Sequence, residues 1–188
     1  MKRYDVIKEI ANTLKDELVV CNLGVPSKEL FDVKDREENF YMMGSMGLAS
    51  SIALGLAVAR PDKEIWCIDG DGALLMNLGS LSTIANSGLT NLTLLVIDNG
   101  VYGSTGGQKT HTSKNTRLDI IAKGAGFKSI VSINKKKDII PILEERGENT
   151  RFILIKAEPG NSPVKNISLS PIEIKNRFLQ STSKKNLN

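Results

Sequence analysis

The stretch EIWCIDGDGALLMNLGSLSTIANSGLTNLTLLVIDNGVY, from Glu64 to Tyr102, decides the fold of this chain. An apolar run ends at Asp69-Gly70-Asp71-Gly72, a helical pattern follows, and a second apolar run, Leu92 to Ile97, stops at Asp98-Asn99-Gly100. Parallel strands are buried on both faces and need a long crossover, so two such strands joined by a helix fit this order. The stretch predicts the centre of an open parallel sheet.

Polar residues follow both predicted strands. In an open parallel sheet, ligands bind beyond the carboxyl ends of the strands, where this sequence places the carboxylate of Asp71 and the amide of Asn99. Mg²⁺ takes one or two protein oxygens and fills its other positions with phosphate oxygens and water. Gly70, Gly72 and Gly100 would let backbone N–H groups approach the anion. The pattern indicates a hard cation that holds a phosphate, whereas Gly-Asp-Gly taken by itself also fits a tight turn.

Three other ligand loops are excluded by spacing. A dinucleotide fingerprint needs a glycine where Leu75 stands, and a calcium loop needs Asp or Asn at Ala73 and Gly at Leu74. A phosphate loop of the GxxxxGK[ST] type needs a glycine where Gln108 stands. The glycines of this chain therefore belong to another kind of site.

Gly-Asp-Gly after one strand and Asn99 after the next resemble the cofactor motif of the thiamine diphosphate enzymes. Within that family the chain is similar to the beta subunits of sulfopyruvate decarboxylases, which are relatives of phosphonopyruvate decarboxylases. The similarity runs from about Cys21 to Glu158 and rests on three segments: Gly44–Gly47, Cys67–Ala73 and Gly106–Gln108. Together with the strand pattern, it predicts a doubly wound α/β domain with a mainly parallel sheet of about six strands.

The resemblance implies a cofactor and its ligands. Mg²⁺ would be held by the Asp71 carboxylate, the Asn99 amide oxygen and the Val101 carbonyl, with diphosphate oxygens and a water completing six ligands. The Gly44 carbonyl would accept a hydrogen bond from the pyrimidine amino group, and the Met46 side chain would bend the cofactor. The implied thiamine diphosphate contacts are Gly44, Ser45, Met46, Gly70, Asp71, Gly72, Ala73, Asn99, Val101, Tyr102 and Gly103. Ala73 stands where many relatives carry a hydroxyl, so one hydrogen bond to the diphosphate is absent.

The reaction implied by the resemblance is decarboxylation of a small anionic 2-oxoacid. The first candidate is 3-sulfopyruvate, giving sulfoacetaldehyde and CO₂ in coenzyme M biosynthesis, and the second is phosphonopyruvate. Residues 102–108 also resemble the beta subunits of 2-oxoacid:ferredoxin oxidoreductases, although two cysteines cannot supply a four-thiolate cluster site. A subunit that binds the cofactor without catalysis is the remaining alternative.

A polar loop without periodicity, Gly103 to Lys114, follows the cofactor motif. Its cationic side chains could hold the acidic end of a substrate. Lys109 is a candidate for anion binding and His111 for proton transfer, while the alternative is a surface loop with solvated charges. No catalytic residue is assigned beyond these two candidates.

The resemblance places the catalytic glutamate on another chain. Such enzymes use a glutamate of a separate pyrimidine-binding domain, for which 188 residues leave no room beside the diphosphate domain. We expect residues 1–180 to form one domain, residues 181–188 to be a disordered tail, and an alpha subunit to carry the pyrimidine domain. The helix Leu48 to Ala59, rich in small residues, should lie close to that contact.

Composition limits the remaining function classes. The net charge of +4 and the aromatic content of 5% offer no platform for nucleic acid. No apolar run approaches the roughly 18 residues of a membrane span, and the amino terminus lacks a signal-peptide core. We expect a cytoplasmic protein in which Cys21 and Cys67 are buried and reduced.

The remaining pattern predicts further strands and helices. The other strands are expected at 18–21, 40–42, 127–133 and 152–157. Helices are expected at 4–14, after an N-cap at Ser27, after Gly72 to about Ala85, at 118–125 and 135–145, and from a Ser170-Pro171-Ile172-Glu173 capping box to about Leu179.

Overall fold

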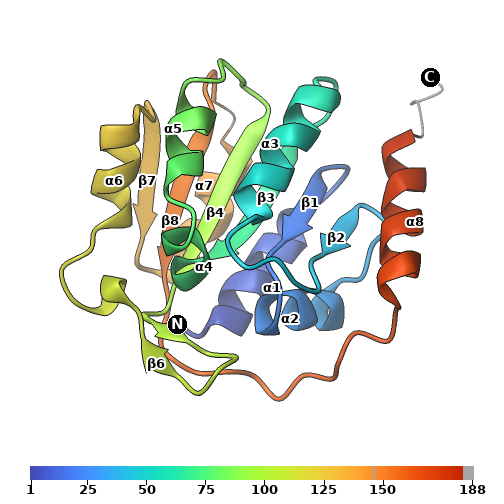
Figure 1. Cartoon of the computed structure of the whole chain (residues 1–188), viewed down its shortest axis with the longest axis horizontal. Coiled ribbons are helices and arrows are strands. Elements are labelled where there is room, and N and C mark those ends of the chain that lie inside the picture. The colour runs from blue at the N-terminus through green and yellow to red at the C-terminus, as the bar shows by residue number, and fades with distance from the viewer. Residues whose placement is uncertain (146, 184–188) are drawn as a thin grey trace.

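The computed structural model describes residues 1–145 and 147–183, and its centre is a six-stranded parallel sheet. The strand order is β2-β1-β3-β4-β8-β7, with every neighbouring pair parallel (Figure 1). The six strands are β1 Leu18–Cys21, β2 Asn39–Tyr41, β3 Ile65–Gly70, β4 Leu92–Asp98, β7 Ser129–Ile133 and β8 Arg151–Lys156. The predicted parallel sheet of about six strands is confirmed.

Helices cover both faces of the sheet, as expected for a doubly wound fold (Figure 1). Side chains alternate along β3: Ile65 and Cys67 belong to one hydrophobic core, Trp66 and Ile68 to the other. The first core is covered by α3 Ala49–Ala59, α4 Asp71–Leu75, α5 Gly79–Ala85 and α6 Leu118–Ala125. The second is covered by α1 Arg3–Thr13, α2 Val25–Val33 and α7 Ile139–Glu144.

Three predicted elements differ in detail. The helix expected after Gly72 is split into α4 and α5, and between them the Asn77 amide donates to the Gly47 carbonyl oxygen (3.0 Å) and the Ser51 hydroxyl (3.1 Å). The helix expected at 135–145 begins as the 3-10 turn η2 Lys136–Asp138 before α7. The polar loop 103–114 is partly ordered by a hairpin, β5 Val101–Tyr102 with β6 Gln108–Lys109, and by the 3-10 turn η1 His111–Ser113.

The prediction that Ser27 caps α2 is wrong. The helix begins at Val25 after Gly24, because Pro26 has a fixed φ that suits the first turn and needs no N–H partner there. The Ser27 hydroxyl instead donates to the carbonyl oxygens of Cys21 (3.1 Å) and Asn22 (2.8 Å). It therefore ties α2 to the end of β1, next to the pocket described below.

The carboxyl-terminal helix α8, Pro171–Ser183, packs beside edge strand β2. Its capping box is confirmed: the Ser170 N–H donates to the Glu173 carboxylate (2.7 Å), and the Glu173 N–H donates to the Ser170 hydroxyl (3.3 Å). The helix reaches Ser183, so residues 181–183 of the expected disordered tail are helical. Residues 184–188 lie outside the described part of the chain.

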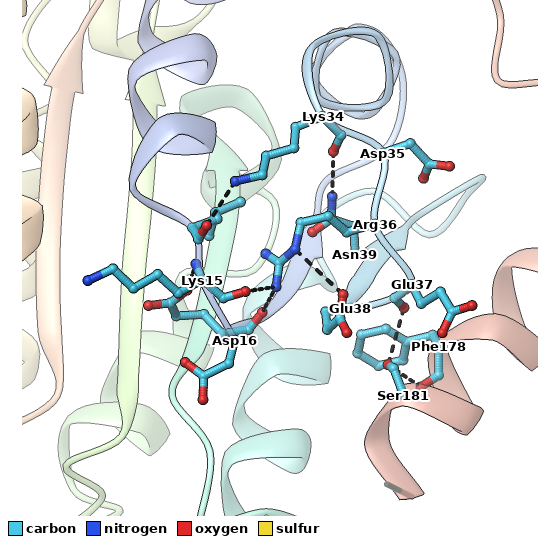
Figure 2. A network of polar contacts seen from close by, with 12 residues as sticks. Lys15, Asp16, Lys34, Asp35, Arg36, Glu37, Glu38, Asn39, Phe178 and Ser181 are labelled. Carbon is cyan, nitrogen blue, oxygen red and sulfur yellow. Dashed lines mark hydrogen bonds and ion pairs between the residues drawn. The ribbon is translucent and has the colours of Figure 1, made fainter. Parts of the chain in front are cut away.

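Polar contacts fix the segment that leads from α2 into β2 (Figure 2). Arg36 donates to the carbonyl oxygens of Lys15 (2.8 Å) and Glu17 (3.1 Å), and the Ser181 hydroxyl donates to the carbonyl oxygen of Glu37 (3.2 Å). These bonds join the turn before β1, the loop before β2 and α8. Helix α8 is thereby held beside the edge strand β2.

Both cysteines are buried and free, as predicted. Burial raises the pKa of the Cys21 thiol to about 12, so the thiol is protonated and unreactive at neutral pH. Within residues 1–145 and 147–183, no helix is long and apolar enough to cross a bilayer.

Candidate cofactor site

A pocket of about 130 Å³ opens at the carboxyl ends of β1, β3 and β4, the position predicted for the ligand. Most of the predicted cofactor contacts line it: Met46, Gly70, Asp71, Gly72, Ala73, Asn99, Val101, Tyr102 and Gly103. Gly44 and Ser45 are exposed and lie outside the lining. The other lining residues are Arg3, Asn22, Leu23, Pro26, Asp69, Ile97, Ser104 and Thr105.

Asp71 is the first residue of α4, directly after β3, and only 2% of it is exposed. Its Oδ2 accepts hydrogen bonds from the hydroxyls of Thr110 (2.5 Å) and Thr112 (2.9 Å). Burial raises the pKa of the Asp71 carboxyl, and the hydrogen bonds from the two threonines offset part of this shift. A nearby cation would relieve the cost of keeping this carboxylate charged.

Asn99 reaches the same edge of the sheet from β4. Gly70 pairs in register with Ile97, so the residues that follow the two strands lie beside one another. The Asn99 Oδ1 accepts a hydrogen bond from the N–H of Val101 (3.3 Å), while its Nδ2 is buried without a partner among the described residues. Gly100 turns the chain between them with a φ of 70°, a left-handed conformation that favours glycine.

Three buried polar atoms at this pocket have no hydrogen-bond partner within the described chain: Asn22 Oδ1, Asp69 Oδ2 and Asn99 Nδ2. Burial raises the pKa of Asp69 to about 7, although the Gly70 N–H donates to its Oδ1 (2.8 Å). A buried polar atom without a hydrogen bond destabilises the folded state. Two acceptor oxygens and one donor nitrogen without partners beside one pocket therefore fit a ligand that carries both a cation and an anion.

A divalent ion with a diphosphate is such a ligand, and the donor set suits it. Asp71 supplies one carboxylate, and Asn99 and Val101 can add an amide and a carbonyl oxygen, which are hard ligands of the kind Mg²⁺ prefers. In the described residues, no three His, Cys, Asp or Glu side chains gather to hold a metal by themselves. The remaining ligands would have to come from the phosphate and from water.

Two glycines allow close approach at the pocket. A Cβ on Gly72 would lie 2.4 Å from Cε1 of the Tyr102 ring, so the aromatic ring packs directly on the Gly72 backbone. A Cβ on Gly47 would lie 3.1 Å from the Met76 Cβ and 3.2 Å from the Ala73 carbonyl oxygen. The turn that carries Met46 is thereby held against α4.

Ser45, in the same turn, is the non-glycine residue with positive φ (60°) in the part of the chain that the structure describes. Such a conformation is uncommon for a residue with a Cβ and tends to occur at functional sites. The neighbouring Asn77 holds this turn through its bond to the Gly47 carbonyl oxygen. The local sequence around Asn77 did not predict that its side chain would hold the turn that carries Met46.

Arg3 is a pocket residue that sequence reasoning missed. Its guanidinium binds Glu29 through Nε (2.8 Å) and Nη2 (3.2 Å), and Nη2 also donates to the Asn161 side-chain oxygen (2.9 Å). The Asn161 amide in turn donates to the Gly103 carbonyl oxygen (2.7 Å). Because Arg3 lies 26 residues from Glu29 and 158 from Asn161, no local pattern could have shown this contact.

Lys109 and His111 are exposed and lie outside the pocket lining, as does Lys114. Lys109 belongs to the short strand β6, and His111 begins the turn η1. The structure of this chain does not bring them to the cofactor pocket, so their substrate roles stay predictions.

Comparison with known families agrees with this geometry. The model of the thiamine pyrophosphate enzyme, C-terminal TPP binding domain matches residues 27–157, which include all the predicted metal ligands. The chain belongs to this family. The match ends just after the last strand of the sheet, β8, while four pocket residues precede its start: Arg3, Asn22, Leu23 and Pro26.

Sequence identity to named relatives shows to which branch of the family the chain belongs. The chain is 52% identical to the sulfopyruvate decarboxylase subunit beta of Methanocaldococcus jannaschii, over 95% of this chain and 96% of that protein. It is 34% identical to the phosphonopyruvate decarboxylase of Streptomyces viridochromogenes, over 90% of this chain but 43% of that protein. The chain is thus a member of the sulfopyruvate decarboxylase beta subunits, and the phosphonopyruvate enzymes are more distant relatives.

A solved structure supports the fold. The 2-oxoglutarate:ferredoxin oxidoreductase from Magnetococcus marinus superposes with a TM-score of 0.68 at 19% identity, over 88% of this chain and 64% of that one. At this identity the similarity concerns the arrangement of strands and helices alone.

Proposed function

We propose that this chain is the beta subunit of a decarboxylase that uses thiamine diphosphate and Mg²⁺ to convert 3-sulfopyruvate to sulfoacetaldehyde and CO₂, a step in coenzyme M biosynthesis. The observation that carries the proposal is the 52% identity with a sulfopyruvate decarboxylase beta subunit along nearly the whole of both chains. The pocket at the carboxyl edge, with its unpaired polar atoms, supports the cofactor part. Residues 1–180 would act as one cofactor-binding domain, and the proposed location is the cytoplasm.

The proposed roles follow from the atoms at the pocket. The Asp71 carboxylate and the oxygens of Asn99 and Val101 would hold Mg²⁺, and the unpaired Asn99 Nδ2 would donate to a diphosphate oxygen. Met46, on its strained turn, would support the bent cofactor. The cofactor would supply the electron sink for the carbon dioxide that leaves.

The proposed partner is an alpha subunit that carries the pyrimidine-binding domain and its glutamate. The chain spans only 43% of the phosphonopyruvate decarboxylase that it matches, so that relative contains further sequence which a separate subunit could supply here. Large apolar side chains are exposed on α3 (Ile52 and Val58), at its N-cap Leu48, at the α4 C-cap Met76 and at Met43. Exposed large apolar side chains are common at protein contacts, and we propose that the alpha subunit contacts α3.

The test is an assay of the chain with and without its alpha subunit. We expect decarboxylation of 3-sulfopyruvate by the pair, with thiamine diphosphate and Mg²⁺, and little turnover by the beta chain alone. Equal turnover by the isolated chain would contradict the need for a partner. A higher kcat/KM for phosphonopyruvate than for 3-sulfopyruvate would replace the proposed substrate by the second candidate, which rests on the 34% identity to a phosphonopyruvate decarboxylase.

A further inference from the structure

Arg3 is the only cationic side chain that lines the cofactor pocket in the part of the chain that the structure describes. Just 7% of it is exposed. Its Nε and Nη2 bind the two oxygens of the Glu29 carboxylate, and Nη2 also donates to the Asn161 side-chain oxygen. A guanidinium carries five N–H donors, so these three bonds leave the two N–H groups of Nη1 for a ligand.

The Nη1 atom of Arg3 lies at an open edge of the pocket. A Cβ on Gly103, which also lines the pocket, would lie 3.6 Å from Nη1. The hydrogen bonds of Arg3 to other described residues come from Nε and Nη2 and not from Nη1. The buried unpaired side-chain atoms of the described residues do not include Nη1, so a ligand can reach this nitrogen. The unpaired face of the guanidinium therefore borders the space in which the cofactor is proposed to bind.

The bonds on the other side of the guanidinium fix its direction. Glu29 belongs to α2 and is fully buried. The Asn161 amide donates to the Gly103 carbonyl oxygen (2.7 Å), so the segment that follows β8 joins Arg3 to the loop after β5. Figure 1 shows the amino terminus at this edge of the sheet, beside the hairpin. A side chain that is already held in one orientation loses little conformational freedom when it binds a ligand.

We infer that Arg3 is an anion-binding residue of this pocket, and that its Nη1 donates to an oxygen of a phosphate or sulfonate group. Charged hydrogen bonds from arginine to such oxygens are roughly twice as strong as neutral ones. Because Glu29 balances the charge of Arg3, the directed donors of Nη1 rather than a net positive charge would hold the anion. The proposed reaction has two ligands that carry these groups: the diphosphate of the cofactor and the sulfonate of the substrate. The inference rests on the proposed function, because it assumes that the pocket holds one of these ligands.

The first measurement is cofactor affinity, which needs no turnover. The assembled two-subunit protein with Mg²⁺ is titrated by calorimetry with thiamine diphosphate and with thiamine monophosphate, for the wild type and Arg3→Lys. Lysine can keep the ion pair with Glu29, but it has one nitrogen in place of the guanidinium fork. Loss of a hydrogen bond to a charged group costs about tenfold or more in affinity. A contact with the terminal phosphate therefore predicts that fall for thiamine diphosphate and a smaller fall for thiamine monophosphate.

The second measurement is the KM at saturating thiamine diphosphate, for 3-sulfopyruvate and for pyruvate, whose tail is uncharged. A contact with the sulfonate predicts that Arg3→Lys raises the KM for 3-sulfopyruvate about tenfold and leaves the KM for pyruvate unchanged. A change in either ratio, of the two cofactor affinities or of the two KM values, supports anion binding by Arg3 and identifies the anion. Wild-type values of both ratios, whether or not the single constants change, would overturn the inference.

Two variants control for a purely structural role of Arg3. Asn161→Ala removes the bond to the Gly103 carbonyl oxygen and leaves Arg3 in place. Arg151→Lys is the matched control, since it alters an arginine of similar burial, 8% exposed, at the amino end of the sheet. Both ratios should keep their wild-type values in these two variants. The same shift in Asn161→Ala as in Arg3→Lys would show that Arg3 acts only by holding the loop, which would overturn the inference.

Asp71→Asn separates this inference from the proposed function. Unchanged Mg²⁺-dependent cofactor binding in that variant would overturn the proposed function. Loss of this binding, together with wild-type ratios in Arg3→Lys, would make the Arg3 inference alone wrong. Circular dichroism establishes that each variant is folded. Should Arg3→Lys fail to fold, the double variant Arg3→Gln with Glu29→Gln carries the same test, because it removes both buried charges and leaves neither unpaired.

Discussion

The two ends of the central sheet differ in how their polar groups are paired. The cavity at the amino end is the larger, about 450 Å³ against about 130 Å³ at the carboxyl end. Charged side chains that line this larger cavity are nevertheless hydrogen-bonded within the protein. Arg151 donates to the carbonyl oxygens of Glu145 (2.6 Å) and Ile142 (2.5 Å), and Glu17 accepts from the Lys15 N–H (2.6 Å).

At the carboxyl end, the fold leaves buried atoms of Asn22, Asp69 and Asn99 unpaired, whereas none of the buried unpaired side-chain atoms in the described residues lines the larger cavity. Because a buried polar atom without a partner lowers stability, such atoms gather where a ligand completes the bonding. The unpaired atoms, rather than cavity size, support the carboxyl end as the proposed cofactor end; the two others in the described residues, Arg36 Nη1 and Asn39 Oδ1, lie before and in β2 and line neither cavity.

The strongest way to break this comparison is Asp71→Asn, which removes the only charge among the predicted metal ligands. We expect Mg²⁺-dependent binding of thiamine diphosphate to weaken by at least about 100-fold, since direct ligands matter more than the outer partners that cost 10- to 100-fold. The cofactor-free protein should lose no stability, because burial already disfavours the charged form of this carboxyl and raises its pKa. Calorimetric titration and thermal unfolding of the same samples measure both quantities. Tight cofactor binding by the variant would show that the metal does not bind at the carboxyl end of the sheet.

Asp69→Asn tests how much stability the protein loses through an unpaired buried carboxyl at the carboxyl end of the sheet. Because burial raises the pKa of Asp69 to about 7, the folded state holds a proton that the unfolded state has released, and stability falls as the pH rises from about 4 to 7. The fall amounts to at most about 4 kcal/mol, at 1.36 kcal/mol for each unit of pKa. The variant should lack this fall and be the more stable protein at pH 8. Thermal unfolding of the cofactor-free proteins at pH 5 and pH 8 gives the comparison, and parallel curves for both proteins would refute it.

Arg151→Met tests the amino end of the sheet, where the polar groups are hydrogen-bonded within the protein. The substitution leaves two carbonyl oxygens at the end of α7 without their donor, so we expect a loss of about 2–3 kcal/mol in the free energy of unfolding. Cofactor affinity should stay at the wild-type value. Urea unfolding measures the first quantity and calorimetry the second. Weakened cofactor binding in this variant would mean that the amino-end cavity also serves the site.

The smallest effect is expected for Lys109→Met, because Lys109 is exposed and outside both cavities. Stability should change by less than about 0.5 kcal/mol and cofactor affinity not at all. Steady-state kinetics of the two-subunit enzyme then decide its predicted role. A raised KM for 3-sulfopyruvate with an unchanged KM for an uncharged-tail 2-oxoacid would place Lys109 at the acidic end of the substrate. Equal KM changes for both would assign it to the loop alone.

The sequence by itself determined the sheet and which polar residues meet at its carboxyl edge. Buried parallel strands are recognisable as apolar runs, and the residues that follow two adjacent strands must meet at one edge, so Asp71 and Asn99 could be placed together without coordinates. The Ser170 capping box was equally readable, because both of its bonds lie within one helical turn.

Only the tertiary structure decided which partners the polar side chains take. Thr110 binds Asp71 from 39 residues away, and Arg3 reaches Asn161 from 158 residues away. Ser27 could have capped a helix, and the fold uses it to tie α2 to β1 instead. A hydroxyl or guanidinium can bond many acceptors, and packing of distant segments selects among them. The bonds to Asp71, the proposed metal ligand, therefore leave no periodic trace in the sequence.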